Sequence, residues 1–309
     1  MAVSLLEAAK AHTGDVFRAG VIETLGYEGT VLSVLPFTDI PGGSYDYIQE
    51  GNLGSVSYRG YNESYPEGTG QLQEKNEKLH VLGGNSDVDR AIVKTHGEGI
   101  RDTQDGMKIK AMALSFNRTF IKGDSDANVR EFSGLQRRLV GGQLVSAGAT
   151  AGGNALSLTV LDQAIDAVDG PTHIFMNKAI RRRLSAASRS TTIGGFITYE
   201  QDAFGRRVQM YGDLPIVIID EDETGTQILA FDEASANGGA AVCTSIYVAS
   251  LSETGLTGIQ NGDAEASDLG LLDNGSIFRT NVEWLQSIAL MRPKCASRLL
   301  GITNAAVVA

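Results

Sequence analysis

The chain has 309 residues, of which 42% are hydrophobic and 20% are charged. This composition is ordinary for folded proteins and excludes extensive disorder, and the length suffices for one large or two modest domains. The 37 acidic and 26 basic residues leave a net charge of −11, which argues against a reader of nucleic-acid sequence. This charge is still compatible with a protein that encloses nucleic acid without binding it tightly.

Cysteine usage and the first residues predict a soluble intracellular protein. Cys243 and Cys295 are too few for a disulfide framework or a zinc site, so a reducing compartment such as the cytoplasm is expected. Residues 1–4 do not begin a signal peptide, and no apolar run approaches the roughly 18 residues that span a membrane.

The first 80 residues predict a helix, a strand and a long excursion. Ser4 to His12 are helix formers behind an N-cap serine, and Val31 to Ile40 form a β-branched run that ends at a Pro-Gly-Gly turn. Residues 44–80 hold few aliphatic residues but five of the nine tyrosines: Tyr45, Tyr47, Tyr58, Tyr61 and Tyr65. Such a segment cannot bury a core of its own. It is expected either to lie on another surface as a two-stranded excursion or to form a half-buried hairpin within the same domain.

A long amphipathic helix is predicted next. Ser86 to Asp89 resemble a capping start, and the secure helix runs from about Gln104 to Lys122, with Gly123 as its C-terminal stop. The main apolar stripe comprises Ile100, Met107, Ala111, Leu114 and Ile121, flanked by a line of Met112, Phe116 and Phe120. We expect this helix to underlie a sheet.

The second half of the chain has the mixed pattern of an α+β domain after a glycine-rich joint at 149–153. Helices are predicted at Leu161–Val168 and Lys178–Arg189. Strands are predicted at Thr172–Met176, Phe196–Tyr199, Arg207–Tyr211, Ile216–Asp220, Ile228–Phe231, Thr244–Leu251, Ile277–Val282 and Trp284–Met291.

A search for catalytic patterns is largely negative. The chain has no Gly-x-Ser-x-Gly elbow, no Gly-Lys of a phosphate loop and no His-x-x-x-His pair, so no catalytic residue, cofactor or metal is expected. The run from Asp220 to Glu223 is predicted to be a solvent-exposed turn after a strand. The alternative is a hard-cation site of a metal-dependent hydrolase.

Residues 178–189 carry a basic run without an acidic residue. The basic residues would lie on the solvent-exposed face of a helix whose other face is apolar. They are Lys178, Arg181, Arg182, Arg183 and Arg189. In a molecule of net charge −11, this run suits salt bridges between subunits better than capture of DNA.

Taken in order, these pieces resemble the major capsid proteins of tailed bacteriophages, which have the Hong Kong 97-like fold that encapsulin nanocompartments also use. Ser115–Asp124, with its Phe-Ile-Lys-Gly-Asp ending, is similar to the end of that family's spine helix. The remaining matches are Leu161–Val168, Met176–Arg183, Asp202–Gly205, Tyr211–Ile216, Ser245–Ala249, Gly255–Gln260 and Val282–Ile302.

The resemblance implies an α+β fold in five parts. These are an N-terminal arm and first strand (1–43), an extended β-hairpin loop (44–84), the spine helix with the first part of a peripheral domain (85–150), an axial domain (151–262) and the second part of the peripheral domain (263–309). The loop would reach over a neighbouring subunit. Because the arm begins almost at Met1, scaffolding is expected from a separate protein. Lys75 and Lys78 lie in the loop, but without an identifiable partner no cross-link is predicted.

The implied function is structural. Pentamers and hexamers of the chain would form an icosahedral viral capsid around double-stranded DNA, without sequence-specific contacts to it, and would assemble in the host cytoplasm. Partners would be other copies, scaffolding and portal proteins and a decoration protein, with no membrane. An encapsulin-like shell is the alternative. The candidate interface residues are Tyr45, Tyr47, Tyr58, Tyr61, Tyr65, Arg181, Arg182 and Arg183.

Overall fold

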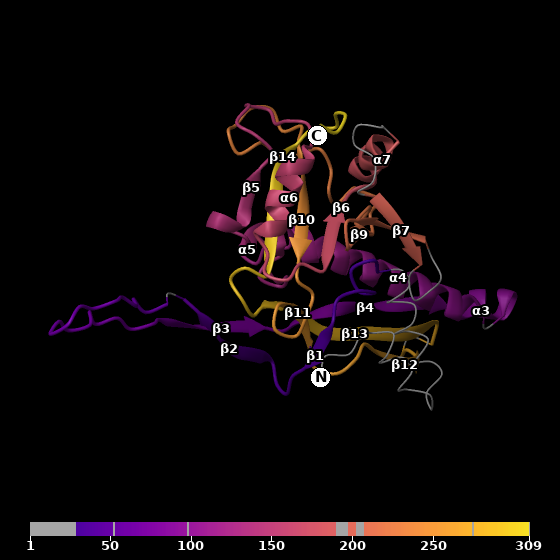
Figure 1. The fold of residues 1–309 in the computed structure, drawn as a ribbon. Helices are drawn as coiled ribbons and strands as arrows, with labels where there is room; N and C mark the ends of the chain where they lie inside the picture. The colour runs from indigo at the N-terminus through magenta and orange to yellow at the C-terminus, as the bar shows by residue number, and fades with distance from the viewer. Residues whose placement is uncertain are drawn as a thin grey trace.

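The fold is α+β, with two large sheets, a separate two-stranded ribbon and a long helix that contacts both large sheets (Figure 1). The computed structural model describes residues 29–51, 53–97, 99–189, 197–201, 207–273 and 275–308. The helix predicted over Ser4–His12 therefore lies outside the described residues. Within the described ranges, no helix has the length and apolar content needed to span a bilayer.

The first sheet is organised around one long strand. Its members are β1 (Phe37–Asp39), β4 (His80–Asp89), β11 (Leu256–Gln260), β12 (Glu265–Leu271) and β13 (Ile277–Leu290). Strand β4 pairs along one edge of β13, β11 and β12 share the other edge, and β1 runs parallel to β11. One 14-residue strand thus joins β4 to β11 and β12, which lie far from β4 in the sequence.

The second sheet has seven strands. In spatial order they are β5 (Leu144–Ser146), β14 (Ala296–Ile302), β10 (Thr244–Ala249), β6 (His173–Met176), β9 (Leu214–Ile218), β8 (Arg207–Tyr211) and β7 (Ile197–Gln201). Helices α6 (Leu158–Asp166) and α7 (Lys178–Ala187) bury Leu161, Ile180 and Leu184 in one core cluster on this sheet. The opposite face, with Phe175 and Tyr247, belongs to the larger core cluster around α4.

Helix α4 (Gly99–Lys122) supplies the centre of that larger cluster. The Phe116 ring lies 5.7 Å from Trp284 of β13 and 5.8 Å from Phe132, measured between ring centroids. Phe120, one turn further, lies 5.6 Å from Phe175 of the seven-stranded sheet. The helix therefore packs on both sheets, as apolar side chains three to four residues apart share one helix face.

The predicted helix is confirmed, but two details differ. Strand β4 continues to Asp89, whose carboxylate caps a separate short helix, α3 (Arg90–His96), before α4 begins. The buried stripe follows the line of Met112, Phe116 and Phe120, whereas Met107 of the predicted main stripe is 61% exposed. Both sheets lie on the side of the aromatic residues, because these bury the most apolar area.

Several strand predictions need correction. The strand predicted at Val31–Ile40 is a turn followed by the three residues of β1, because Val31, Leu32 and Leu35 pack into the core from the turn. Residues 228–231 form a turn, although Ile228 is buried. The two strands predicted between Ile277 and Met291 are a single strand, β13.

Sheet membership also crosses the predicted boundary at residues 262 and 263. Strand β11 precedes this boundary but lies in the five-stranded sheet with β13. Strand β14 follows it but lies in the seven-stranded sheet beside β10. The remaining short elements are α5 (Leu135–Arg138) and a 3₁₀ turn (Gly141–Gln143), which lead into β5.

Burial of His173 at the start of β6 predicts a pH-dependent stability. Desolvation lowers the pKa of this imidazole from its usual 6.5 to about 4. The unfolded chain binds the proton first, so stability that is fully present above pH 6.5 is lost as the pH falls toward 4. The linked loss is about 2 kcal/mol at pH 5 and about 3 kcal/mol at pH 4.

We expect His173→Gln to remove this part of the pH dependence. The measurement is urea unfolding of both proteins at pH 7, 6 and 5. Carboxylates that titrate in the same range cancel when the two proteins are compared at each pH. Parallel pH profiles for the two proteins would show that His173 accepts a proton in the folded state without penalty.

Candidate assembly surfaces

A two-stranded ribbon projects from the five-stranded sheet (Figure 1). It consists of β2 (Ser44–Glu50) and β3 (Leu72–Lys78), antiparallel and in register from Ser44 opposite Lys78 to Glu50 opposite Leu72. The amide of Gly51 donates to the carbonyl of Gln71 at 2.9 Å, so the pairing continues past the strand ends. The segment is therefore two-stranded, as both alternatives considered for it require.

The part of the ribbon nearest the five-stranded sheet, which we call its root, packs against the rest of the chain. Tyr45 and Tyr47 stack with ring centroids 5.9 Å apart and pack on a small core of Ile40, Ile259 and Ala289. Burial, with the carboxylate of Glu77 nearby, raises the pKa of Tyr47 to about 12, so its phenol is neutral at physiological pH.

An ion pair holds the same root from the second strand. Glu77 of β3 accepts both guanidinium Nη atoms of Arg138 from α5, at 2.5 and 2.7 Å. Both side chains are largely shielded from water, at 14% and 17% exposure, and the paired geometry fixes direction as well as distance. This ion pair therefore restricts the orientation of β3 relative to α5.

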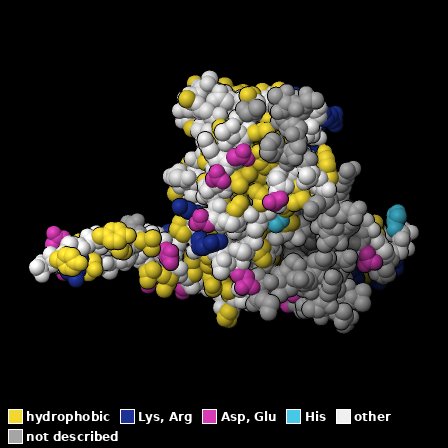
Figure 2. Space-filling view, in the orientation of Figure 1, with side chains coloured by type: hydrophobic (Ala, Val, Ile, Leu, Met, Phe, Trp, Pro, Cys, Tyr) yellow, Lys and Arg dark blue, Asp and Glu magenta, His cyan; other side chains and the backbone are white. Residues whose placement is uncertain are grey.

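The distal part of the ribbon is exposed and apolar (Figure 2). Tyr58 and Tyr61 are fully accessible, and Val56 is 95% exposed. The tip is held only by local contacts among the described residues: Arg59 lies 5.1 Å from the Tyr65 ring centroid, and a turn follows at Gly60–Glu63. Exposed aromatic surface of this kind is typical of interaction sites, so the tip is a candidate for one.

The five tyrosines thus divide into two groups. Tyr45 and Tyr47 lie half-buried at the root, as a hairpin within its own domain would require. Tyr58, Tyr61 and Tyr65 lie on the exposed distal part. The structure separates a structural root from a free tip, which the sequence pattern alone did not distinguish.

The predicted basic run lies on α7. Asn177 caps the helix by accepting the amide of Ile180 at 2.7 Å. Arg181 is half-buried, Arg182 is exposed, and Arg183 donates to the Asn304 side chain at 3.0 Å. The structure does not bring this helix near the tyrosines of the ribbon, so the predicted interface residues form two separate surfaces.

The acidic run at 220–223 does not converge on a common point. Asp220 pairs with Lys178, whereas Asp222 accepts the amides of Thr224 and Thr226, both at 2.9 Å. Desolvation by itself would raise the pKa of Asp222, but the hydrogen bonds from Thr224 and Thr226 together outweigh it and hold this pKa below its usual range. Within the described part of the chain, no group of His, Cys, Asp and Glu residues is arranged to hold a metal ion.

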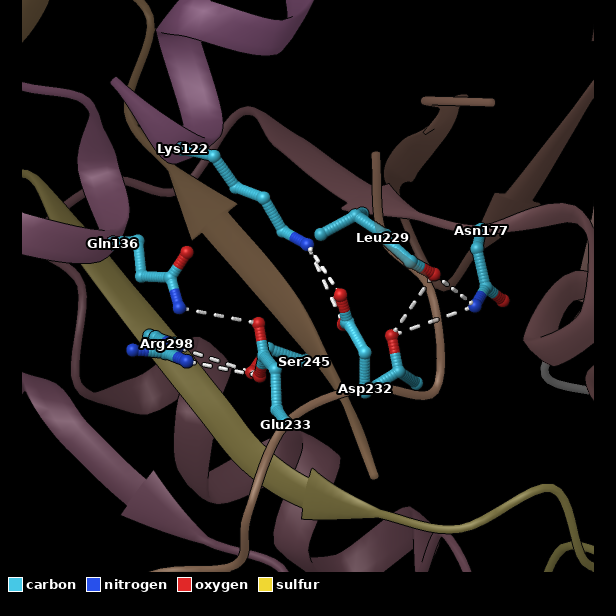
Figure 3. Close-up of polar contacts among 9 residues, drawn as sticks. Lys122, Gln136, Asn177, Leu229, Asp232, Glu233, Ser245 and Arg298 are labelled. Atoms are coloured by element: carbon cyan, nitrogen blue, oxygen red, sulfur yellow. Dashed lines mark hydrogen bonds and ion pairs between the residues drawn. The ribbon is translucent and has the colours of Figure 1, made fainter. Parts of the chain in front are cut away.

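A polar cluster that sequence reasoning missed joins α4 to the seven-stranded sheet (Figure 3). Its centre is Glu233, which accepts Arg298 of β14 at 2.9 Å, Gln136 of α5 at 3.4 Å and the hydroxyl of Ser245. Glu233 is only 9% exposed and Arg298 14%. A charged pair that is shielded from water is costly unless all its polar atoms are hydrogen-bonded. The geometry of this pair therefore specifies how Glu233 is placed against β14 and α5.

Two further contacts complete this junction. Lys122, the last residue of α4, pairs with Asp232 at 3.1 Å. The side chain of Asn177 donates to the carbonyl of Leu229 at 2.7 Å while it caps α7. No local sequence pattern marks these residues, because their partners lie up to 110 positions away.

Known proteins share this architecture. Residues 17–164 match the family described as major capsid protein GP7. No curated protein matches the sequence. The SrpI encapsulin of Synechococcus elongatus PCC 7942 is similar in structure, with a TM-score of 0.63 at 16% identity over 90% of this chain and 89% of the other.

Two further structures are similar over their length. A chain of Mycobacterium phage Bobi gives a TM-score of 0.61 at 11% identity, covering 88% of this chain and 90% of the other. The capsid of a native GTA particle gives 0.60 at 14% identity, covering 89% and 90%. At these identities the structures establish the fold, and the family match agrees with it. The chain therefore has the Hong Kong 97-like fold of these shell proteins, and residues 17–164 relate it to the major capsid protein GP7 family.

Proposed function

We propose that this chain is the capsid protein of a tailed-phage or phage-derived particle and that its pentamers and hexamers enclose double-stranded DNA. The observation that carries the proposal is the ribbon, whose aromatic tip is fully exposed on the isolated chain. A neighbouring copy would cover this surface. Apolar contacts repeated around a closed shell then sum to a large stabilisation, although each contact is reversible.

The charge of the chain supports a DNA-filled interior. A net charge of −11 avoids tight adhesion to packaged DNA, because a polyanion is repelled by an acidic surface. Scaffolding, portal and decoration proteins would be supplied separately, and assembly would take place in the host cytoplasm.

The second candidate is an encapsulin-like shell that holds protein cargo. This candidate is supported by the structural similarity to the SrpI encapsulin, which has a TM-score of 0.63 over nine-tenths of the chain. The family match to a major capsid protein favours the phage assignment.

One experiment tests the proposal and separates the two candidates. The full chain is expressed alone and with the neighbouring genes of its source, and the products are imaged by cryo-electron microscopy. Closed shells of five- and six-fold capsomers with nucleic acid inside are expected. Shells filled with protein would favour the encapsulin candidate, and monomers under all salt and co-expression conditions would contradict shell formation.

A further inference from the structure

Helices α6 and α7 carry opposite charges on their exposed sides. Asp162, Asp166 and the following Asp169 are exposed on or directly after α6, and Arg182 is exposed on α7 beside the half-buried Arg181. Figure 2 shows acidic side chains over α6 and basic side chains at the outer edge beside α7. The two charged groups therefore lie on two different helices that share one core cluster on the seven-stranded sheet.

These charges are not placed where they would stabilise the helices that carry them. Acidic residues stabilise a helix near its N-terminus and basic residues near its C-terminus. Here Asp166 is the last residue of α6, Asp169 follows it, and Arg181 and Arg182 lie in the first half of α7. Each group therefore adds to its own helix dipole in the destabilising sense, which indicates that the charges act on something outside the helix.

The two helices do not neutralise one another within the chain. The C-terminal segment runs between them, because Arg183 of α7 donates to Asn304 while Leu158 of α6 donates its amide to Val308. Within the described part of the chain, Asp166, Asp169, Arg181 and Arg182 form no ion pair. Both groups are left available to a partner.

We infer that the basic side of α7 in one copy binds the acidic side of α6 in the next copy. The inference rests on the proposed shell function and names the partner surface for it. In a ring of the proposed shell this contact is head-to-tail, with α7 of each copy on α6 of the next, and head-to-tail contacts of suitable rotation close into rings. The N-terminal dipole of α7 and the C-terminal dipole of α6 strengthen the attraction in this arrangement.

Charge reversal on each helix, alone and combined, tests the inference. The α7 variant is Arg181→Glu with Arg182→Glu, and the α6 variant is Asp166→Lys with Asp169→Lys, which spares Asp162 because it accepts the Tyr211 hydroxyl at 2.7 Å. We expect each variant to need at least a tenfold higher concentration for half-maximal assembly in sedimentation velocity. The combined four-residue variant should recover the original value, and Arg181→Lys with Arg182→Lys should match the original protein.

The outcomes separate this inference from the proposed function. Thermal unfolding first confirms that each variant is folded, as surface substitutions should allow. Assembly of the original protein but failure of the combined variant to recover would overturn the pairing. Normal shells that have lost nucleic acid in the α7 variant would instead assign the basic helix to DNA. If the original protein forms no shells under any condition, the proposed function fails and the inference falls with it.

Discussion

Replacing residues 53–70 by a short Gly-Ser turn is expected to leave a folded protein that no longer forms shells. The cut is placed where the two strands are still joined, because Gly51 and Gln71 are hydrogen-bonded to each other. It removes Val56, Tyr58 and Tyr61, which contribute nothing to the core of their own chain. The melting temperature should change by no more than a few degrees, while the assembled fraction seen by electron microscopy should fall to background.

A matched pair of variants shows whether the aromatic area is responsible. Tyr58→Ser with Tyr61→Ser removes the two fully exposed aromatic rings and should weaken assembly strongly, whereas Tyr58→Phe with Tyr61→Phe keeps the rings and should assemble. Full shell formation by the shortened ribbon would show that the tip is dispensable and would contradict its role as an interface.

Phe116→Ala is expected to be the most destabilising single substitution proposed for this chain. Phe116 is completely buried, and its ring contacts those of Phe37, Phe120, Phe132 and Trp284. Removing a buried phenylalanine ring typically costs about 3–5 kcal/mol, because the surrounding groups only partly fill the cavity. Denaturant unfolding of the isolated chain measures the change in the free energy of unfolding.

Met107→Ala is the control on the same helix. Met107 is 61% exposed, so its truncation should change stability by less than about 0.5 kcal/mol. A similar loss for both variants would mean that the helix as a whole is fragile and that the aromatic cluster is not its anchor.

Assembly is expected to couple to this core through the polar junction at Glu233. The spine-like helix α4 ends at Lys122, which pairs with Asp232, and the adjacent Glu233 holds Arg298 of the seven-stranded sheet. Any movement of α4 relative to the seven-stranded sheet during shell formation would have to rearrange these contacts. The root of the ribbon is held separately, by Arg138 and Glu77.

Local sequence patterns were sufficient to predict the elements that depend on near neighbours. The aromatic line at spacings of four residues predicted the long helix, and the tyrosine-rich segment without a core predicted the ribbon of β2 and β3. Strands at Thr172–Met176 and Thr244–Leu251 were located nearly to the residue. Periodicity works here because a helix or a strand presents its side chains at fixed intervals.

By itself, then, the sequence determined the α+β class, the long helix, the two-stranded character of residues 44–80 and the lack of a catalytic pattern. Only the tertiary structure decided that β11 and β14 exchange sheets, which apolar line of α4 is buried, and that Glu233 and Arg298 meet. These features depend on pairs such as Phe37 with Gly258, more than 200 residues apart. A local pattern shows that a residue needs a partner, but the choice among distant partners is made by the packing of the whole chain.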